Sequence, residues 1–344
     1  MSMKRIIFSL FTLLLVAVSA EAKYWKIGPG SVTGMDFTSI NAAMESSNVS
    51  AGDTLYLDQY YNEAVEQTVT KQVVIIGTGY DTSLTDEQVV AQLTNTLYLK
   101  ANNVVVKSVK LQQVNFHKDN CTVERCYATC FSTNSTTAGM NHIYSCYIYG
   151  YLVGYSSSYR SKYDIQNCVI RQNTHHGIQY LTSSVIKFNT IINESSYGYY
   201  CLASVYDTEV TNNIILRTHS NYYNYDFSSE CVETGSGNSI EHNILSRTSN
   251  LTYFPTNKIG YYGDKQDELF TLTGSYSDMY KLAENSAAKG YATDGGEVGC
   301  HGGMFGCPSG GRPQYIPYFS KVTVGSRSEN GKLPVSVTIK IQEE

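Results

Sequence analysis

A short pattern recurs seven times along this chain and restricts the folds open to it. In each copy a β-branched residue is followed three positions later by Val, Cys or Asn. The seven copies begin at Val106, Val123, Ile143, Ile165, Ile186, Val210 and Ile240. Successive copies therefore lie between 17 and 30 residues apart, and repeats of this length indicate a solenoid.

Each repeat is too short for a pair of helices and is rich in β-branched and aromatic residues, which favours short strands. Its apolar side chains are buried only when the next coil stacks on it. Stacked coils lie about 4.8 Å apart, so equivalent residues form columns. The fourth positions of the pattern predict one structural ladder, made of Cys126, Cys146, Cys168, Asn189, Asn213 and Asn243.

The residue types of this ladder suit a bend between strands. Asn tolerates the left-handed backbone conformation, and its amide can bond both the turn backbone and the Asn of the neighbouring coils. We expect the three Cys to occupy the same slot as small buried apolar side chains. A residue type that recurs in register is a packing feature, so we assign the ladder no catalytic role.

The ladder and its Asn-x-Ile steps, such as Asn189-Thr-Ile191, resemble the right-handed parallel β-helix of the pectin-lyase-like superfamily. Residues 37–44 and 51–57 resemble its capping helix and first coil, and residues 286–303 resemble the closing segment of secreted bacterial members. The resemblance implies an all-β, single-stranded parallel β-helix of about ten coils. It does not imply one activity, because the superfamily holds lyases, hydrolases, esterases, epimerases and non-catalytic adhesins.

The amino-terminal residues predict export. Lys4 and Arg5 precede the apolar run 6–18, and small residues at Ala20 and Ala22 follow. The run is too short to span a membrane, so residues 1–22 read as a signal peptide. We expect a secreted protein, located outside the cell, at its surface or in the periplasm.

The remaining chain divides into two expected parts. Residues 23–310 form the β-helix with its amino-terminal capping helix, and residues 311–344 form a carboxyl-terminal β extension. Within the extension, 322–324 and 333–341 read as a hairpin joined through Asn330-Gly331.

Composition narrows the class of partner. The net charge is −5 and only 16% of residues are charged, which argues against a nucleic-acid partner. The 30 Tyr residues suit contact with a polysaccharide or surface glycan, since aromatic rings stack on sugars and phenol hydroxyls bond them. The alternative is that many of these rings pack in side-chain ladders along the stack. Both interpretations of the tyrosines stay open. For the oligomeric state, we expect a monomer.

Nine cysteines leave at least one thiol without a disulfide partner. Cys300 and Cys307 flank a Gly-rich loop and are the predicted disulfide. A zinc site made of Cys300, His301 and Cys307 is the alternative, and it lacks a second ligand pair with suitable spacing. The ladder cysteines are expected to stay reduced, because side chains on successive coils point the same way.

Known catalytic motifs of the resembled superfamily are missing. The chain has no Asp-Asp pair, as a polygalacturonase-type hydrolase needs, and no Arg-x-Pro-x-x-Arg arrangement of one lyase branch. A looser set on neighbouring coils is the candidate site. Its catalytic candidates are Lys187, Arg171, Arg217 and His176. Its substrate-binding candidates are His175, Tyr180, Tyr199, Tyr200, His219, Tyr223, Asp226 and Glu230, several of them in the insertion between coils, where a β-helix carries function.

The sequence assigns no cofactor to this protein. Ca²⁺ is an open option through Asp226, Glu230 and Glu233 or through Asp264, Asp267 and Glu268, neither group having the spacing of a calcium loop. The sequence thus favours a non-catalytic glycan-binding or adhesive protein. The alternative is a polysaccharide lyase acting by β-elimination on a uronate-containing glycan, or a related carbohydrate-active enzyme.

Overall fold

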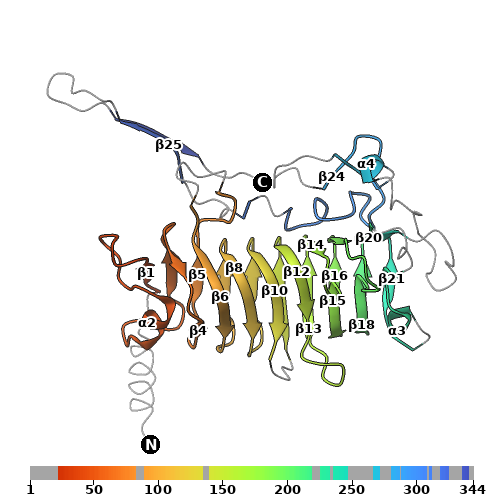
Figure 1. Ribbon diagram of the computed structural model, residues 1–344, viewed down its shortest axis with the longest axis horizontal. Helices are drawn as coiled ribbons and strands as arrows, with labels where there is room; N and C mark the ends of the chain where they lie inside the picture. The colour runs from red at the N-terminus through yellow and green to blue at the C-terminus, as the bar shows by residue number, and fades with distance from the viewer. Residues whose placement is uncertain are drawn as a thin grey trace, which may run out of the picture.

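The chain winds as a stack of coils into a rod (Figure 1). The computed structural model describes residues 22–82, 89–134, 139–218, 225–232, 235–246, 266–271, 280–286, 288–307, 310–311, 318–324 and 335–340. The predicted signal peptide falls almost entirely outside these residues. Within them, no helix has the length and apolar character needed to cross a membrane.

Sheet A carries the β-branched residues of the repeat and has ten strands, all paired in parallel. They are β1 (Tyr24–Ile27), β2 (Thr54–Leu57), β5 (Val74–Ile76), β7 (Val105–Lys107), β9 (Thr122–Glu124), β11 (Met140–Tyr144), β13 (Lys162–Gln166), β16 (Val185–Lys187), β19 (Glu209–Thr211) and β21 (Ser239–Glu241).

Sheet B has twelve strands, also parallel. They are β3 (Asn62–Glu63), β4 (Gln67–Val69), β6 (Gln92–Leu99), β8 (Lys110–Phe116), β10 (Tyr127–Thr133), β12 (Tyr147–Val153), β14 (Val169–Gln172), β15 (Ile178–Thr182), β17 (Thr190–Asn193), β18 (Leu202–Tyr206), β20 (Ile214–Arg217) and β22 (Ile244–Leu245).

Sheet B bends, so each coil has three faces. The first residues of β12 pair with β14, and its last residues pair with β15. In the later coils the bend is a loop, residues 173–177 between β14 and β15 and residues 194–201 between β17 and β18. The prediction of an all-β parallel β-helix is confirmed.

The β-branched residues of the pattern form the core. Ile143, Ile165 and Ile186 are partners in register across three strands of sheet A, and each is fully buried. The helix α2 (Ile40–Glu45) packs Ile40 and Met44 onto this core at its amino-terminal end. The predicted capping helix is therefore present. It covers apolar residues that would otherwise face water at the end of the stack.

The ladder lies at the corner between sheets A and B. Asn213 Oδ1 accepts hydrogen bonds from the backbone nitrogen of Asn189 at 2.8 Å and from its side-chain nitrogen at 3.0 Å. Asn243 Oδ1 accepts the same two bonds from Asn213, both at 2.9 Å. Towards the amino terminus, Asn189 Oδ1 accepts from the backbone nitrogen of Cys168 at 2.9 Å. The ladder thus satisfies backbone donors that the corner would otherwise bury unpaired.

We expected the ladder residue to adopt the left-handed backbone conformation of each turn, and this expectation was wrong. The positive φ belongs to the residue just before it, at Ser108, Arg125, Ser145, Asn167, Phe188, Asn212 and His242. The physical reason is that the ladder side chain must point inward to reach the neighbouring coils. The residue before it makes the turn and points its side chain outward.

A second polar ladder lies at the opposite corner of the coil, where sheet B returns to sheet A. Ser184 Oγ accepts from the backbone nitrogen of Tyr163 at 2.9 Å, and Thr208 Oγ1 accepts from that of Ser184 at 3.2 Å. Asn238 Oδ1 continues the series by accepting from the nitrogen of Thr208 at 2.9 Å. These residues stand two positions before the β-branched residue of the pattern. The sequence analysis did not predict this second ladder, because its members are residues of different types.

The carboxyl-terminal part of the chain runs back along the rod, drawn in blue in Figure 1. We call residues 288–307 the strap. The backbone nitrogen of Thr293 bonds Asn212 Oδ1 at 3.0 Å, and that of Cys300 bonds Thr190 Oγ1 at 3.1 Å. Further on, Ser145 Oγ donates to the carbonyl of Phe305 at 2.8 Å. The strap therefore crosses the coils in reverse order, from the last towards the first.

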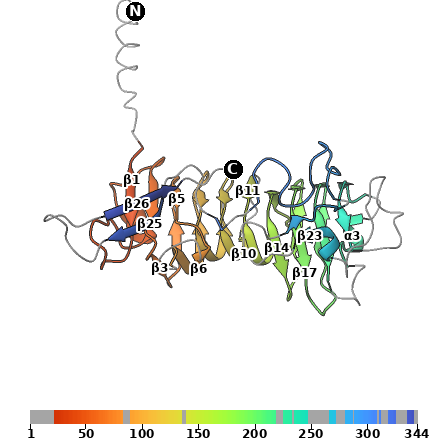
Figure 2. The ribbon, with the colours of Figure 1, turned by 90° about the horizontal axis from the view of Figure 1, so that it is seen from above.

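This segment also covers the outer side of sheet B. Val169, Ile192 and Ile214 point away from the core and form a second apolar cluster with residues of the carboxyl-terminal part, Tyr280, Leu282 and Val298 among them. The predicted hairpin is present as β25 (Tyr318–Val324) and β26 (Val335–Lys340), paired antiparallel. Figures 1 and 2 place it at the end of the rod that holds β1 and β5.

Candidate functional site

The four predicted catalytic residues do not converge in one cleft. Lys187 lies on the outer side of sheet A, where its Nζ is 2.7 Å from Glu209 Oε1. Arg171 lies on sheet B, where its Nη2 is 2.6 Å from Glu194 Oε1. The reason is topological. Residues before the ladder belong to sheet A and residues after it belong to sheet B, and these two faces point in different directions.

Arg217 is fully buried and cannot touch a bound substrate, so its assignment as catalytic was wrong. Its Nη2 donates to the carbonyls of Ser195 and Tyr197, at 2.9 Å in each case. These carbonyls belong to the loop 194–201 at the bend of sheet B. Arg217 is thus a positioning residue for that loop.

The predicted residues that do come together are His175, His176, Tyr199 and Tyr200, all in the two loops at the bend of sheet B. Two further rings join them, Tyr151 from β12 and Tyr225 from beyond β20. We call these six residues the histidine–tyrosine surface. Its position follows from the fold, because equivalent loops of stacked coils lie side by side.

The six rings form two rows that are joined to each other. In the outer row, His175 lies 4.4 Å from Tyr151 and 6.3 Å from Tyr199 between ring centroids. In the inner row, Tyr200 stacks between His176 at 5.6 Å and Tyr225 at 4.7 Å. His176 meets Tyr199 edge-on at 5.5 Å, which links the rows. Such offset and edge-to-face pairs stabilise the arrangement of the rings.

Two of the rings are held in their neutral forms by burial. Burial lowers the pKa of His176, and the neighbouring His175 lowers it further. Its Nδ1 accepts a hydrogen bond from the backbone nitrogen of Tyr200 at 2.9 Å, which assigns the proton of the neutral ring to Nε2. Burial also raises the pKa of Tyr151 to about 12, so its hydroxyl stays neutral. Glu230, exposed and bonded to Ser204 Oγ, is a carboxylate whose charge acts on His176.

The other substrate-binding candidates have different positions. Asp226 is fully buried, so it cannot offer an exposed contact as predicted. Tyr180 lies half-buried in β15 with a positive φ of 60°. His219 and Tyr223 lie outside the described residues. So do Glu233 and Asp264, which leaves the calcium option untested.

The comparison with known families concerns the coils themselves. Residues 73–215 match the family model described as right handed beta helix region. This stretch is a right-handed β-helix. No curated protein and no solved structure matches the chain. The matched residues include Tyr151 and the loops with His175, His176, Tyr199 and Tyr200, so five of the six rings lie on coils of the family fold.

The β-helix also carries a polar cluster on the outer side of sheet A that the sequence analysis missed. Tyr144 donates to Asp164 Oδ2 at 2.6 Å, and His142 Nδ1 lies 2.8 Å from the Tyr144 hydroxyl. Burial raises the pKa of Asp164, but hydrogen bonds from His142, Tyr144 and Gln166 outweigh it and hold the pKa below its usual value. Phe305 of the strap stacks on Tyr144 with ring centroids 4.0 Å apart.

A signal for this cluster was present in the sequence. His142 and Tyr144 flank the β-branched Ile143, and Asp164 precedes Ile165. Residues on either side of an inward residue point outward from a strand. A search of these flanking positions in adjacent repeats would have found the cluster.

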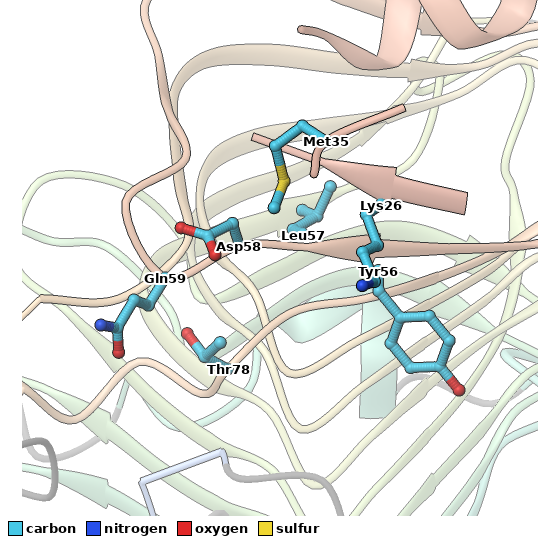
Figure 3. Close-up of a pocket in the computed structure, with 7 residues that line it drawn as sticks. All are labelled: Lys26, Met35, Tyr56, Leu57, Asp58, Gln59 and Thr78. Atoms are coloured by element: carbon cyan, nitrogen blue, oxygen red, sulfur yellow. The ribbon is translucent and has the colours of Figure 1, made fainter. Parts of the chain in front are cut away.

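The first coils of the β-helix form a pocket of about 330 Å³ (Figure 3). Lys26, Asp58 and Gln59 supply its polar groups, and Met35, Tyr56, Leu57 and Thr78 complete the lining. Burial raises the pKa of Asp58. A second pocket of about 210 Å³ shares Gln59 with it. The sequence analysis predicted neither pocket, because these coils precede the repeated pattern.

Proposed function

We propose that this β-helix protein contacts polysaccharide through the histidine–tyrosine surface, as a non-catalytic glycan-binding or adhesive protein. One observation carries the proposal. Six aromatic and imidazole rings from successive coils join in two linked rows at the bend of sheet B. Such rows suit an extended ligand that follows the stack of coils.

The chemistry of the rings suits sugars. Aromatic faces pack against the C–H groups of a sugar ring, while phenol hydroxyls and imidazole nitrogens bond its hydroxyls. Burial keeps His176 neutral, so the surface has no strong preference for anionic chains. A uronate-rich glycan would also meet the carboxylate of Glu230. The proposal therefore favours neutral polysaccharides over polyuronates.

The rings are held before any ligand arrives. The carbonyls of Ser195 and Tyr197 bond the buried guanidinium of Arg217, and the backbone of Tyr200 bonds His176. A surface fixed in this way loses little conformational entropy on binding. This supports a role in recognition.

A second candidate, a polysaccharide lyase or related carbohydrate-active enzyme, rests on the cluster of His142, Tyr144 and Asp164. Lys187 lies on the adjacent strand of the same outer face, so a base and a proton donor share one surface. Phe305 covers part of Tyr144, which restricts access to the cluster. For this reason we rank the enzyme second.

The test is retention in gels that contain neutral polysaccharides or polyuronates, with ultraviolet absorbance recorded for unsaturated products. We expect retention without product, and about fivefold weaker retention in Tyr199→Ala, the equivalent of losing about 1 kcal/mol of ring stacking. Tyr24→Ala is the matched control, since Tyr24 is 70% exposed at the end of the rod that holds β1. Product that disappears in Lys187→Ala would favour the enzyme. Equal weakening in both tyrosine variants would remove the histidine–tyrosine surface from consideration.

The proposal includes export from the cytoplasm. The basic residues and apolar run within 1–22 support it. Mass spectrometry of the mature amino terminus tests this. Cleavage after Ala22 or Ala20 is the expected result, and an intact Met1 in the purified protein is the contrary one.

A further inference from the structure

The strap brings three potential metal ligands together. The ligand atoms of Cys300, His301 and Cys307 all lie within 4.8 Å of one another, and they are the group of this kind found among the described residues. The two sulfur atoms are 3.4 Å apart and are not bonded. The predicted disulfide between them thus stays a prediction, and the histidine adds a donor that a disulfide does not use.

The distances suit a shared metal ion. A disulfide joins its sulfurs at about 2.05 Å. Two thiolates on one tetrahedral zinc, each about 2.3 Å from the metal, lie about 3.8 Å apart. The observed 3.4 Å is nearer the second value. Two soft sulfur ligands with one imidazole nitrogen form a donor set that selects zinc over calcium or magnesium.

We propose that Cys300, His301 and Cys307 bind a zinc ion and leave its fourth position to water or to a group of a bound molecule. Binding replaces the thiol protons of the two cysteines, which pass to solvent, while the imidazole binds in its neutral form. The charge of the ion then balances the two thiolates. No oxidant or reductant takes part.

The coils hold the ligands in place from both ends of the loop. Before the loop, Thr190 Oγ1 accepts from the backbone nitrogen of Cys300 at 3.1 Å, and Asn167 Nδ2 donates to its carbonyl at 3.0 Å. After it, Ser145 Oγ donates to the carbonyls of Phe305 and Gly306, at 2.8 Å each. Because these partners belong to the rigid β-helix, the loop is ordered before the metal arrives.

Glycines allow the loop to lie this close to the coils. Gly303 has a φ of +70°, and a Cβ there would come within 2.7 Å of the Phe188 ring. A Cβ on Gly302 would come within 1.9 Å of the carbonyl oxygen of Glu297. The tight turn brings His301 and Cys307 to the same side. A metal here would close the loop 300–307 within the strap, away from the histidine–tyrosine surface.

The test uses the full mature chain, purified with a reductant and stripped with a chelator. Titration with Co²⁺ should give one equivalent with the intense bands of tetrahedral cobalt–thiolate coordination, and Zn²⁺ should displace it. His301→Ala should weaken Zn²⁺ binding by about a hundredfold, since even outer partners of a metal site contribute about tenfold to a hundredfold. Met304→Ala is the matched control, because Met304 lies in the same loop and is 85% exposed.

Two results would overturn the proposal. One is a Co²⁺ spectrum and a Zn²⁺ affinity unchanged by both His301→Ala and Cys307→Ser. The other is a Cys300–Cys307 disulfide, detected as a linked peptide in protein isolated without reductant, together with no metal above background. His301→Ala changes a half-buried side chain and keeps both cysteines, so it gives an answer even where Cys307→Ser folds poorly. Glycan retention need not change in either case, which separates this test from that of the proposed function.

Discussion

Two bends of the same coil differ in what covers them. At the corner beside the ladder, short polar side chains such as Ser145, Asn167 and Asn212 point outward and bond the strap. At the bend of sheet B, rings are prominent among the outward side chains of the loops, and His175 and Tyr197 are exposed. The first bend is therefore occupied by the protein itself. The second is left for a partner, and the functional proposal rests on this difference.

The largest expected effect comes from the ladder at the first bend. Asn213→Leu removes the acceptor of the Asn189 backbone nitrogen and the donor to the carbonyl of Ile186. Each buried group left unpaired costs about 1–3 kcal/mol, so we expect the free energy of unfolding to fall by roughly 3 kcal/mol. Urea unfolding followed by circular dichroism measures it. Asn48→Ala, at an exposed Asn, should change little, and an equal effect of the two variants would contradict the ladder's role.

The next prediction tests whether the two bends are independent of each other. Asn167→Ala removes the bonds from its side chain to the carbonyls of Cys300 and Gly302. We expect a loss of about 1–2 kcal/mol, confined to the strap. Hydrogen exchange should rise in residues 299–306 and stay unchanged in 194–201, and glycan retention should be preserved. Faster exchange in both segments would mean that the bends are not independent.

The third effect concerns pH at the bend of sheet B. Because the fold lowers the pKa of His176, its neutral form is favoured in the folded state. That contribution to stability is complete above the unfolded-state pKa of about 6.5 and is lost as the pH falls through the lower folded-state pKa. Neighbouring ionisable groups are the same in both proteins when wild type is compared with His176→Gln. Unfolding at about pH 7.5 and about pH 5 should show a smaller loss in the variant, and parallel losses would contradict the assignment.

The smallest effect is expected on sheet A. Lys187 forms a partly exposed ion pair with Glu209. Exposed pairs contribute between about 0 and 1 kcal/mol, so Lys187→Ala should change the free energy of unfolding by at most about 0.5 kcal/mol and leave glycan retention unchanged. A large loss of retention would move the binding surface to sheet A and favour the enzyme.

The fold could be predicted from the sequence because a solenoid repeats its requirements. Each coil needs an inward β-branched residue and a corner residue, and the spacing between Ile143 and Cys146 recurs in every copy. The strap could not be predicted in this way. Its bonds join residues far apart in sequence, such as Ser145 and Phe305, and no periodic pattern records them.

The site was predicted only in part. His175, His176, Tyr199 and Tyr200 come together because they occupy equivalent loops of successive coils. Arg217 was misassigned because its charge suggested exposure, whereas two backbone carbonyls of a loop satisfy its guanidinium inside the protein. Burial of a charged side chain depends on such local partners.

Hydroxyl-radical footprinting with and without a retained polysaccharide tests the difference between the bends most directly. The account predicts that the ligand protects His175, Tyr197 and Tyr199 from oxidation, while Tyr24 and Met304 react as before. Protection of Tyr56 beside the pocket of the first coils, or of Tyr144 under the strap, with none at the histidine–tyrosine surface would contradict it.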